Sequence, residues 1–314
     1  MIAIKQAQES PLVSVIIPNY NHAKYLDQRL KSILNQSYSN IEVIILDDCS
    51  TDNSIEVIDK YKYDTRIKSI LVNEHNSGNT FLQWDKGLRV SNGDLIWIAE
   101  SDDYCELNLL QELITAYTHR KNTVLAYSTL TLVDECGNVT CDVRHSANQY
   151  FSSSQYLRRY LSLANFVRNA SCAVFSRSAA LKVSADYLKY SSAGDYLFWI
   201  EIASQGRVAV VNKGISYFRR HSGVITERRD ADGTNFTAEK EILNKLFSMV
   251  KILYLRKIYI YSYHCRRVLN TQYDSDIIRD NLYSLWEIKK YSGIISRSIM
   301  KVTDAIRYRF NMYL

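Results

Sequence analysis

Two clusters of adjacent acids are the residues of this chain best suited to chemistry. One is the pair Asp47-Asp48, and the other is the segment Glu100-Ser101-Asp102-Asp103. Carboxylate oxygens are the ligands that Mg²⁺ and Mn²⁺ prefer, and these ions bridge readily to phosphate oxygens. Like charges packed together are costly unless a cation or a polar ligand compensates them. The clusters therefore indicate a divalent metal and a ligand that carries phosphate.

A simpler interpretation stays open beside this one. Aspartate is a strong N-cap, so each cluster could cap the helix that follows it, and the second such helix is predicted to begin near Glu106. One isolated aspartate would favour capping. Two clusters, each directly after a predicted strand, favour a ligand site.

The glycine-rich loops that commonly cradle phosphate do not occur in this sequence. Neither GxGxxG nor GxxxxGK[ST] is present. A phosphate-bearing ligand would then lack the usual ring of backbone N–H donors, and its charge must be neutralised in another way. A metal held by the acids supplies that neutralisation.

The elements that must position these acids are predicted by the pattern of apolar residues. Short runs rich in Val and Ile, without strict alternation, are typical of strands buried on both faces of a parallel sheet. Stretches with helical spacing separate them, so the pattern predicts an α/β sheet with helices on both faces. The four runs are Leu12 to Ile17, Ile41 to Leu46, Ile67 to Val72 and Leu95 to Ala99.

Polar segments follow all four predicted strands. In an open α/β sheet, ligands bind in the crevice beyond the carboxyl ends of the strands, so these segments are expected to form one site. They are Pro18-Asn19-Tyr20-Asn21, Asp47 to Asp52, Asn76-Ser77-Gly78-Asn79 and Glu100 to Asp103.

The pattern changes twice further along the chain. After residue 122 short strands and helices mix, and from Asn235 onward the spacing is helical. Only 2 prolines and 10 glycines occur, so no flexible linker marks a boundary. We predict a catalytic domain over residues 1–235, with halves 11–122 and 123–235, and a basic helical C-terminal extension over residues 236–314.

Six short motifs, in this order, resemble those of the family 2 glycosyltransferases. They are PNYN, DDCSTD, NSGN, ESDD, AGDYLFW and Arg219-Arg220-His221, and together they span about residues 11 to 225. The resemblance implies the GT-A fold, a Rossmann-like nucleotide-diphospho-sugar transferase with a mixed sheet flanked by helices. It also implies transfer of a sugar from a nucleotide diphosphate donor, usually UDP-linked, to a saccharide or lipid-linked saccharide acceptor, with inversion, in the synthesis of a bacterial capsule, O-antigen or similar polymer.

The resemblance also implies roles for individual residues of the donor site. Tyr20 would lie beside the nucleobase and Asp48 would accept a hydrogen bond from its N3–H. Mn²⁺ or Mg²⁺ would be held by Asp102, Asp103 and His221. The full set of predicted nucleotide-binding residues is Pro18, Tyr20, Asn21, Asp48, Asn76, Gly78, Asp102, Arg219 and Arg220.

Asp195 falls where members of this family carry the catalytic base. It would take the proton from the acceptor hydroxyl, although it could also cap the helix expected near Tyr196. The chain departs from the family pattern at two positions, because Gly194 replaces a common Glu and Glu100 replaces a common Asp. The predicted acceptor and sugar contacts are Glu100, Ser171, Gly194 and Trp199.

Positive charge is concentrated in the C-terminal part. The whole chain has a formal charge of +6, whereas the residues from Lys240 onward carry 14 Lys/Arg and 6 Asp/Glu, a net of +8. This extension either packs as a helical hairpin with solvated cations or contacts the inner leaflet of a membrane. The nearly neutral first part argues against a nucleic-acid groove there.

Other features of the composition predict a cytoplasmic protein, and peripheral contact with the cytoplasmic membrane is compatible with them. The six cysteines form no CxxC pair, the first ten residues lack the apolar stretch of a signal peptide, and no window reaches the apolar length of a membrane span. Two alternatives for the function stay open: a receiver-like signalling module that binds Mg²⁺, and a nucleotide-binding subunit without catalysis. Only Gly194 favours the second.

Overall fold

A computed structural model describes residues 10–142, 147–220, 225–293, 298 and 301. The chain forms two compact units. The sheet unit comprises the chain up to Gln149, Asn169–Val183 and Ala209–Arg219, and the helical unit comprises Tyr150–Arg168, Ser184–Val208 and the chain from Arg220. These units differ from the predicted division at residue 235, because two internal segments fold with the C-terminal helices. Spacing along the sequence does not reveal which distant segments pack together.

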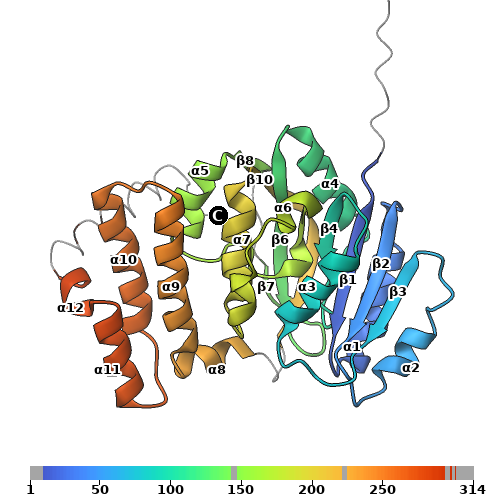
Figure 1. Cartoon of the computed structure of the whole chain (residues 1–314), viewed down its shortest axis with the longest axis horizontal. Helices are drawn as coiled ribbons and strands as arrows, with labels where there is room; N and C mark the ends of the chain where they lie inside the picture. The colour runs from blue at the N-terminus through green and yellow to red at the C-terminus, as the bar shows by residue number, and fades with distance from the viewer. Residues whose placement is uncertain (1–9, 143–146, 221–224, 294–297, 299–300, 302–314) are drawn as a thin grey trace, which may run out of the picture. The chain divides into compact units, whose positions relative to one another are not determined.

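Four parallel strands form the first part of the sheet (Figure 1). They are β1 (Val13–Asn19), β2 (Ile41–Asp47), β3 (Ile67–Val72) and β4 (Leu95–Ile98), in the order β3-β2-β1-β4. Their register pairs Val13 with Ile41 and with Leu95. All four strands therefore end at one edge, as the sequence predicted.

The expectation that all four strands are buried on both faces is wrong for β3. Strands β1, β2 and β4 are buried along their whole length, whereas every residue of β3 is at least partly exposed. The reason is its place at the end of the strand order, where it has one neighbour instead of two.

The rest of the sheet is antiparallel where its pairings are described, so the sheet is mixed. Strand β4 pairs with β9, β9 with β6, β6 with β7 and β10 with β5. These strands are β5 (Tyr104–Cys105), β6 (Thr123–Val133), β7 (Val139–Asp142), β9 (Ala173–Ser176) and β10 (Arg207–Arg219). The short strand β8 covers Gln149–Phe151. The change of sequence pattern after residue 122 coincides with this change from parallel to antiparallel pairing.

The helices of the sheet unit present apolar faces at helical spacing. Helix α1 (Ala23–Leu34) buries Tyr25, Leu26, Leu30 and Ile33. Burying one leucine of this kind stabilises the fold by about 1.5 to 3 kcal/mol. Helix α3 (Thr80–Val90) lies so close to β1 that a Cβ at Gly87 would come within 2.5 Å of Ile16. The remaining helices are α2 (Ser54–Asp59), α4 (Leu109–His119), α6 (Arg177–Ala180) and the 3₁₀ turn η2 (Ala170–Cys172).

The helix after the second acid cluster begins later than predicted. Strand β5 follows the acids directly, and α4 begins at Leu109 with Asn108 at its N-cap. Helix α2 begins at Ser54, with Asn53 at its N-cap. The acids at 102 and 103 therefore cap no helix.

The helical unit contains the segments that carry the rest of the predicted site. Helix α7 (Gly194–Ser204) is buried along nearly its whole length. The other helices are α5 (Ser153–Tyr156), η1 (Leu157–Leu161), η3 (Ala185–Lys189), α8 (Ile225–Ala231), α9 (Thr234–Met249), α10 (Tyr254–Leu269), α11 (Asp276–Leu285) and α12 (Ile288–Tyr291). Within the described ranges, no helix has both the length and the apolar character that crossing a membrane requires.

Candidate functional site

The ends of β1 and β2 are tied together by Asp47. This buried carboxylate accepts hydrogen bonds from the Asn19 side chain at 2.7 Å and from the Ser50 hydroxyl at 2.7 Å and backbone N–H at 2.8 Å. Its oxygens are used inside the protein, so Asp47 shapes the two loops. The sequence analysis grouped Asp47 with Asp48, but in the structure the two carboxylates have different hydrogen-bond partners.

Tyr20 is presented at the surface of the loop after β1. Its side chain is 43% exposed, whereas Pro18 is buried within β1. The next residue, Asn21, has a φ of +56°, and its side-chain oxygen accepts from the backbone N–H of Thr51 at 2.8 Å. Asn21 thus holds the loop in shape, while the ring of Tyr20 is open to a ligand.

Asp48 anchors the segment after β3. Its carboxylate accepts from the side chains of Asn73 at 2.6 Å and Gln83 at 2.9 Å, and from the Ser77 hydroxyl at 2.7 Å. The segment turns at Gly78, which has a φ of +69° and donates its N–H to the Asn76 side chain at 2.6 Å. Asp48 is buried, so in this structure its main partners are protein groups.

The acids after β4 differ strongly in exposure. Asp103 is 1% exposed and accepts from the Asn169 side chain at 2.8 Å, from the Ser171 hydroxyl at 2.7 Å and from the Arg219 backbone N–H at 3.1 Å. Asp102 is half-buried on the same turn. Asp102 is therefore the better placed of the two for direct contact with a ligand, and Asp103 holds the turn.

Glu100 is held at two points. Its side chain accepts from the Trp84 indole N–H at 3.0 Å, and its backbone N–H donates to the Ser171 hydroxyl at 3.0 Å. Ser171 is fully buried. Among the described residues, the Ser171 hydroxyl contacts Glu100 and Asp103 and so supports the acid cluster. Its predicted contact with the acceptor stays a prediction.

The pKa values of Glu100 and Asp103 are both raised. Burial, followed by the charges of Asp102 and Asp103, raises the pKa of Glu100 to about 8. Burial and the charge of Asp102 raise the pKa of Asp103 to about 7. An acidic cluster of this kind is stabilised by a cation.

The donor set fits a metal that is shared with a ligand. No group of three or more His, Cys, Asp or Glu side chains is arranged around a metal position in the part of the chain that the structure describes. His221, the predicted third ligand, lies outside the described residues. Mg²⁺ commonly takes one or two carboxylates and completes its shell with phosphate oxygens and water. A half-buried Asp102 beside two further acids matches that pattern.

Arg29 is a functional candidate that sequence reasoning missed. It lies on α1, is fully buried, and its guanidinium carbon sits 5.1 Å from the centre of the Trp97 ring. Its Nε and Nη2 atoms have no hydrogen-bond partner in the structure. Its positive charge opposes the rise in pKa of both Glu100 and Asp103. A cation on the apolar face of a predicted helix was the signal that could have revealed it.

The Arg219 side chain donates all its described hydrogen bonds to groups of the sheet unit. Its Nε donates to the Asp102 carbonyl at 2.9 Å, and its other nitrogens donate to the Glu135 carbonyl at 3.0 Å and the Gln28 side chain at 2.9 Å. It is buried, and its guanidinium faces the Tyr25 ring at 4.6 Å. Arg220 is exposed, so it suits the predicted phosphate contact better than Arg219.

In the helical unit, Asp195 lies in the first turn of α7. Its carboxylate accepts from the Tyr196 backbone N–H at 2.8 Å and from the Asn165 side chain at 2.7 Å. The N-cap position belongs to Ala193, so Asp195 is not the N-cap residue. Burial raises the pKa of Asp195 to about 7, while the two hydrogen bonds oppose the rise. A base with such a pKa changes protonation near neutral pH.

The prediction that Trp199 lines a sugar site is wrong. Its side chain is fully buried, and its ring packs edge-on against Phe198 with centroids 5.1 Å apart. The cause is that α7 is buried on nearly all sides, so a residue one turn after Asp195 points into the core. Gly194 is also buried, at the first position of the helix.

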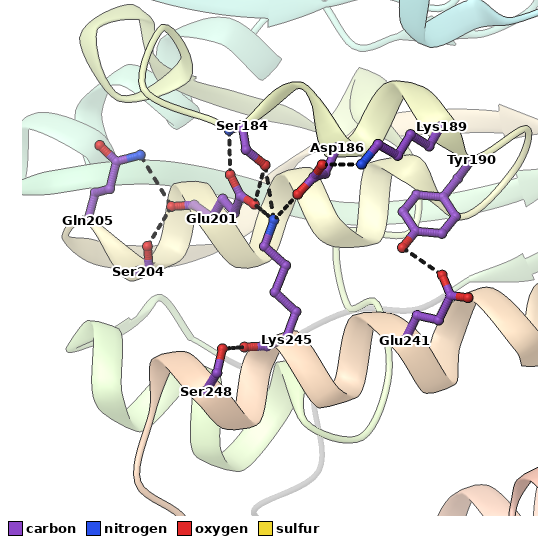
Figure 2. Close-up of polar contacts among 10 residues, drawn as sticks. All are labelled: Ser184, Asp186, Lys189, Tyr190, Glu201, Ser204, Gln205, Glu241, Lys245 and Ser248. Atoms are coloured by element: carbon purple, nitrogen blue, oxygen red, sulfur yellow. Dashed lines mark hydrogen bonds and ion pairs between the residues drawn. The ribbon is translucent and has the colours of Figure 1, made fainter.

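A polar network holds α7 in place (Figure 2). The Lys245 ammonium on α9 lies 2.6 Å from a Glu201 oxygen on α7, 2.8 Å from Asp186 and 3.0 Å from the Ser184 hydroxyl. Glu201 also accepts from the Ser184 backbone N–H at 2.6 Å. These contacts join η3, α7 and α9, and so they fix the helix that carries Asp195.

Comparison with known proteins identifies relatives of one kind. The profile described as "Glycosyl transferase family 2" matches residues 14–183. An uncharacterized glycosyltransferase of Haemophilus influenzae is 24% identical over 98% of this chain and 94% of its own length. The poly(ribitol-phosphate) beta-N-acetylglucosaminyltransferase TarS of Staphylococcus aureus is 31% identical over 36% of this chain and 20% of its own length. Matches to other curated relatives span between 32% and 50% of those proteins.

Solved structures share the fold at low sequence identity. Residues 1–349 of S. aureus TarS in complex with UDP-GlcNAc superpose with a TM-score of 0.60 and 18% identity, over 96% of this chain and 92% of that one. The mannosyltransferase PcManGT from Pyrobaculum calidifontis, in complex with GDP-Man and Mn²⁺, gives a TM-score of 0.58 and 13% identity, over 96% and 81%. The predicted GT-A fold with C-terminal helices is confirmed.

The raised pKa of Glu100 gives a testable pH dependence for the metal-free protein. A carboxyl group whose pKa is higher in the folded than in the unfolded state stabilises the fold fully below its unfolded pKa, and this contribution is lost as the pH rises through about 8. Glu100→Gln keeps the acceptor for Trp84 and cannot ionise. We therefore expect the variant to gain stability relative to the parent as the pH rises from 6 to 8, by at most on the order of 2 kcal/mol.

Chemical unfolding at pH 6 and pH 8 without divalent ions measures this difference. Glu56→Gln on α2, an exposed acid of the same unit, is the control and should show no such gain. A difference between parent and Glu100→Gln that is the same at both pH values contradicts the assignment.

Proposed function

Because this chain belongs to glycosyltransferase family 2, we propose that it moves a sugar from a nucleotide diphosphate donor to a hydroxyl acceptor with inversion at the anomeric carbon. The observation that carries the proposal is the Asp195 carboxylate at the start of α7, which accepts hydrogen bonds from the Asn165 side chain and the Tyr196 backbone N–H. The acid cluster after β4 supports it. Family membership excludes the receiver-like alternative, and the inactive subunit is an outcome that the experiments below distinguish.

Asp195 acts as the general base. Its carboxylate takes the proton of the acceptor hydroxyl as the hydroxyl oxygen forms a bond to the anomeric carbon. The bond from that carbon to the diphosphate oxygen breaks on the opposite face, and the nucleotide diphosphate leaves with the bonding electron pair. General base catalysis typically contributes about 10²- to 10⁴-fold to the rate. The Asn165 amide orients the carboxylate and favours its ionised form.

The donor binds at the edge of the sheet unit. The exposed Tyr20 ring suits contact with the nucleobase, and the turn at Asn76 and Gly78 borders the same edge. Asp48 sets the shape of this pocket through Asn73, Ser77 and Gln83, and its predicted bond to the base N3–H remains part of the proposal. TarS in complex with UDP-GlcNAc supports a UDP-linked donor.

A divalent ion, Mn²⁺ or Mg²⁺, belongs to the proposed donor site. Asp102 would hold it directly, and Asp103 and Glu100 would contribute negative charge beside it. When bound, the ion offsets the negative charge of the leaving diphosphate. The complex of PcManGT with GDP-Man and Mn²⁺ supports this assignment. The exposed Arg220 would contact the diphosphate, and His221 is the proposed further ligand.

The acceptor belongs to a bacterial surface polymer in this proposal. The likeness to TarS, and to the putative teichuronic acid biosynthesis glycosyltransferase TuaG of Bacillus subtilis, supports a saccharide or lipid-linked saccharide. We place the protein on the cytoplasmic side, where it meets nucleotide sugars. The catalytic role is assigned to residues 1–235, with the basic extension over 236–314 supporting it.

Replacing the proposed base separates binding from transfer. Asp195→Asn keeps the shape and the contact with Asn165 but cannot accept a proton. We expect donor binding to stay within about twofold of the parent, while transfer falls about 10²- to 10⁴-fold. Isothermal titration with UDP and Mn²⁺ measures the first, and release of UDP from UDP-sugars measures the second. Equal turnover would remove Asp195 from this role, and a parent with no turnover on any donor and acceptor tried would favour the inactive subunit.

Replacing the proposed metal ligand should weaken the metal-dependent binding of the donor nucleotide. Asp102→Ala removes the half-buried carboxylate, so we expect UDP affinity in Mn²⁺ to fall by roughly 10- to 100-fold. Without divalent ions the variant and the parent should bind UDP alike. Asp85→Ala, which removes an exposed ion pair with Arg89 in the same unit, is the control. Unchanged affinity in Asp102→Ala contradicts the assignment.

The hydrogen bond from Asn165 should set the pH dependence of transfer. This bond lowers the pKa of Asp195, so Asn165→Ala should move the acidic limb of the kcat profile above pH 7. Activity lost at pH 7 should then return at higher pH. Asn165→Ser, which retains a donor, should move the limb less. A uniform loss at every pH would show that Asn165 is needed only for folding or binding.

A further inference from the structure

The turn between α9 and α10 exposes large apolar side chains. Leu253, Tyr254 and Leu255 are 76%, 76% and 65% exposed, and Met249 at the end of α9 is 39% exposed. Other exposed apolar residues within the described ranges are scattered, and this is the one place where three such residues are adjacent. A contiguous apolar patch on a soluble domain marks an interaction surface.

The core of the helical unit does not use this patch. Helix α10 buries Tyr259, Ile260, Cys265 and Val268, which lie further along the helix than Tyr254 and Leu255. Ile252, within the same turn, is buried and anchors the turn. The exposed residues therefore stand on a fixed support.

Cations flank the apolar residues along the chain, and acids are absent from the segments that form the patch. The chain from Leu246 to Tyr273 contains no Asp or Glu, and neither does the chain from Tyr150 to Arg168. The first segment carries Lys251, Arg256 and Lys257 next to the apolar residues, and Lys251 is exposed. Such a surface attracts anions over a distance of about 10 Å in 0.1 M salt.

One side chain joins the two acid-free segments. The Arg256 guanidinium donates to the backbone carbonyls of Arg158 and Arg159 on η1, at 3.2 Å and 3.3 Å. Both of these arginines have exposed side chains. The apolar turn therefore lies beside a second pair of cations that the sequence places almost a hundred residues away.

We propose that this surface docks the protein on an anionic lipid bilayer. The docking surface comprises Met249, Leu253, Tyr254 and Leu255, with Lys251, Arg256, Lys257, Arg158 and Arg159. Its apolar side chains enter the boundary between headgroups and acyl chains, and its cations contact the lipid phosphates. Interfacial binding depends on this combination of buried apolar area and attraction to anionic lipid.

The composition of the surface favours a bilayer over the other partners. Nucleic acid is recognised by cations with hydrogen-bonding or stacking groups, and two exposed leucines offer it nothing. A protein partner of acidic character would need carboxylates matched to each cation, whereas a bilayer provides many phosphates beside an apolar interior. Only the role of the docking surface, which is to bring the enzyme to a lipid-linked acceptor, rests on the proposed function.

Insertion of the turn can be measured with one substitution in the full chain. All four native tryptophans, Trp84, Trp97, Trp199 and Trp286, are buried, so Tyr254→Trp introduces a tryptophan with an exposed side chain. With vesicles containing 30% phosphatidylglycerol whose acyl chains carry bromine, its emission should be quenched and shifted to the blue. Vesicles of phosphatidylcholine alone should produce neither change. Protection from acrylamide before vesicles are added would show that protein already covers the turn and would overturn the proposal.

Paired variants test both components of the surface by vesicle sedimentation. Arg158→Gln with Arg159→Gln keeps the carbonyls that Arg256 uses, and should weaken binding about 30-fold, roughly fivefold for each cation lost. Leu253→Ser with Leu255→Ser should weaken binding at least tenfold, including in 0.5 M NaCl. Leu107→Ser with Leu181→Ser, which changes two exposed leucines of the sheet unit, should bind as the parent does.

The failure of this inference is distinct from failure of the proposed function. The docking variants should bind UDP and Mn²⁺ in solution as the parent does, and they should unfold at the same temperature. Absence of vesicle binding by the parent at low salt overturns the docking surface and leaves the transferase intact. Equal binding by the docking and control variants overturns it as well, because the contact would then involve another part of the chain.

Discussion

The placement of three acids on one turn after β4 is the constraint on which the sheet unit depends. Taking carboxylates out of water and setting them beside one another is unfavourable, and the pKa values of about 8 for Glu100 and about 7 for Asp103 express that cost. The protein compensates it in part with neutral donors. Asn169, Ser171 and the Arg219 backbone all donate to Asp103. The remaining charge is left for a cation to balance.

Arg29 accounts for a further part of the compensation. A fully buried guanidinium without complete hydrogen bonding is itself costly, by about 1 to 3 kcal/mol for each unpaired group. Arg29 lies on the face of the Trp97 ring, near the acids. Its permanent positive charge stabilises the carboxylates in the metal-free protein, and this gain offsets part of the cost. The interior of the sheet and its functional edge are therefore one electrostatic unit.

Most of the parallel sheet could be predicted from the sequence because its signals are local. Four Val- and Ile-rich runs gave strands β1 to β4 within one or two residues, and the polar segments after them met at one edge. What the sequence could not give depends on contacts between distant residues. Such contacts cause the burial of Asp103 and the internal hydrogen bonds of the Arg219 guanidinium. They also place Arg29 near the acids. The exposed face of β3 follows from strand order, which periodicity does not encode.

The same distinction explains the errors around Asp195. A position after a polar loop was recognised correctly as a helix start, but Trp199 was misplaced because α7 has no polar face from which its orientation could be read. The partner of Asp195 is Asn165, thirty residues earlier, and no pattern links the two. Likewise, the Lys245 network that fixes α7 joins residues from three segments.

Burial is the main cause of the raised pKa values at both acidic centres, but neighbouring acids add to it only at the β4 edge. A cation bound there would lower those pKa values and ionise the cluster. At Asp195, burial is the cause and no carboxylate contributes, since Gly194 stands where a second acid is common in the family. The proposed base is therefore a single carboxyl group whose pKa is controlled by burial and by Asn165. Glycine at position 194 is compatible with the proposed role of Asp195, because abstraction of one proton requires only one carboxylate.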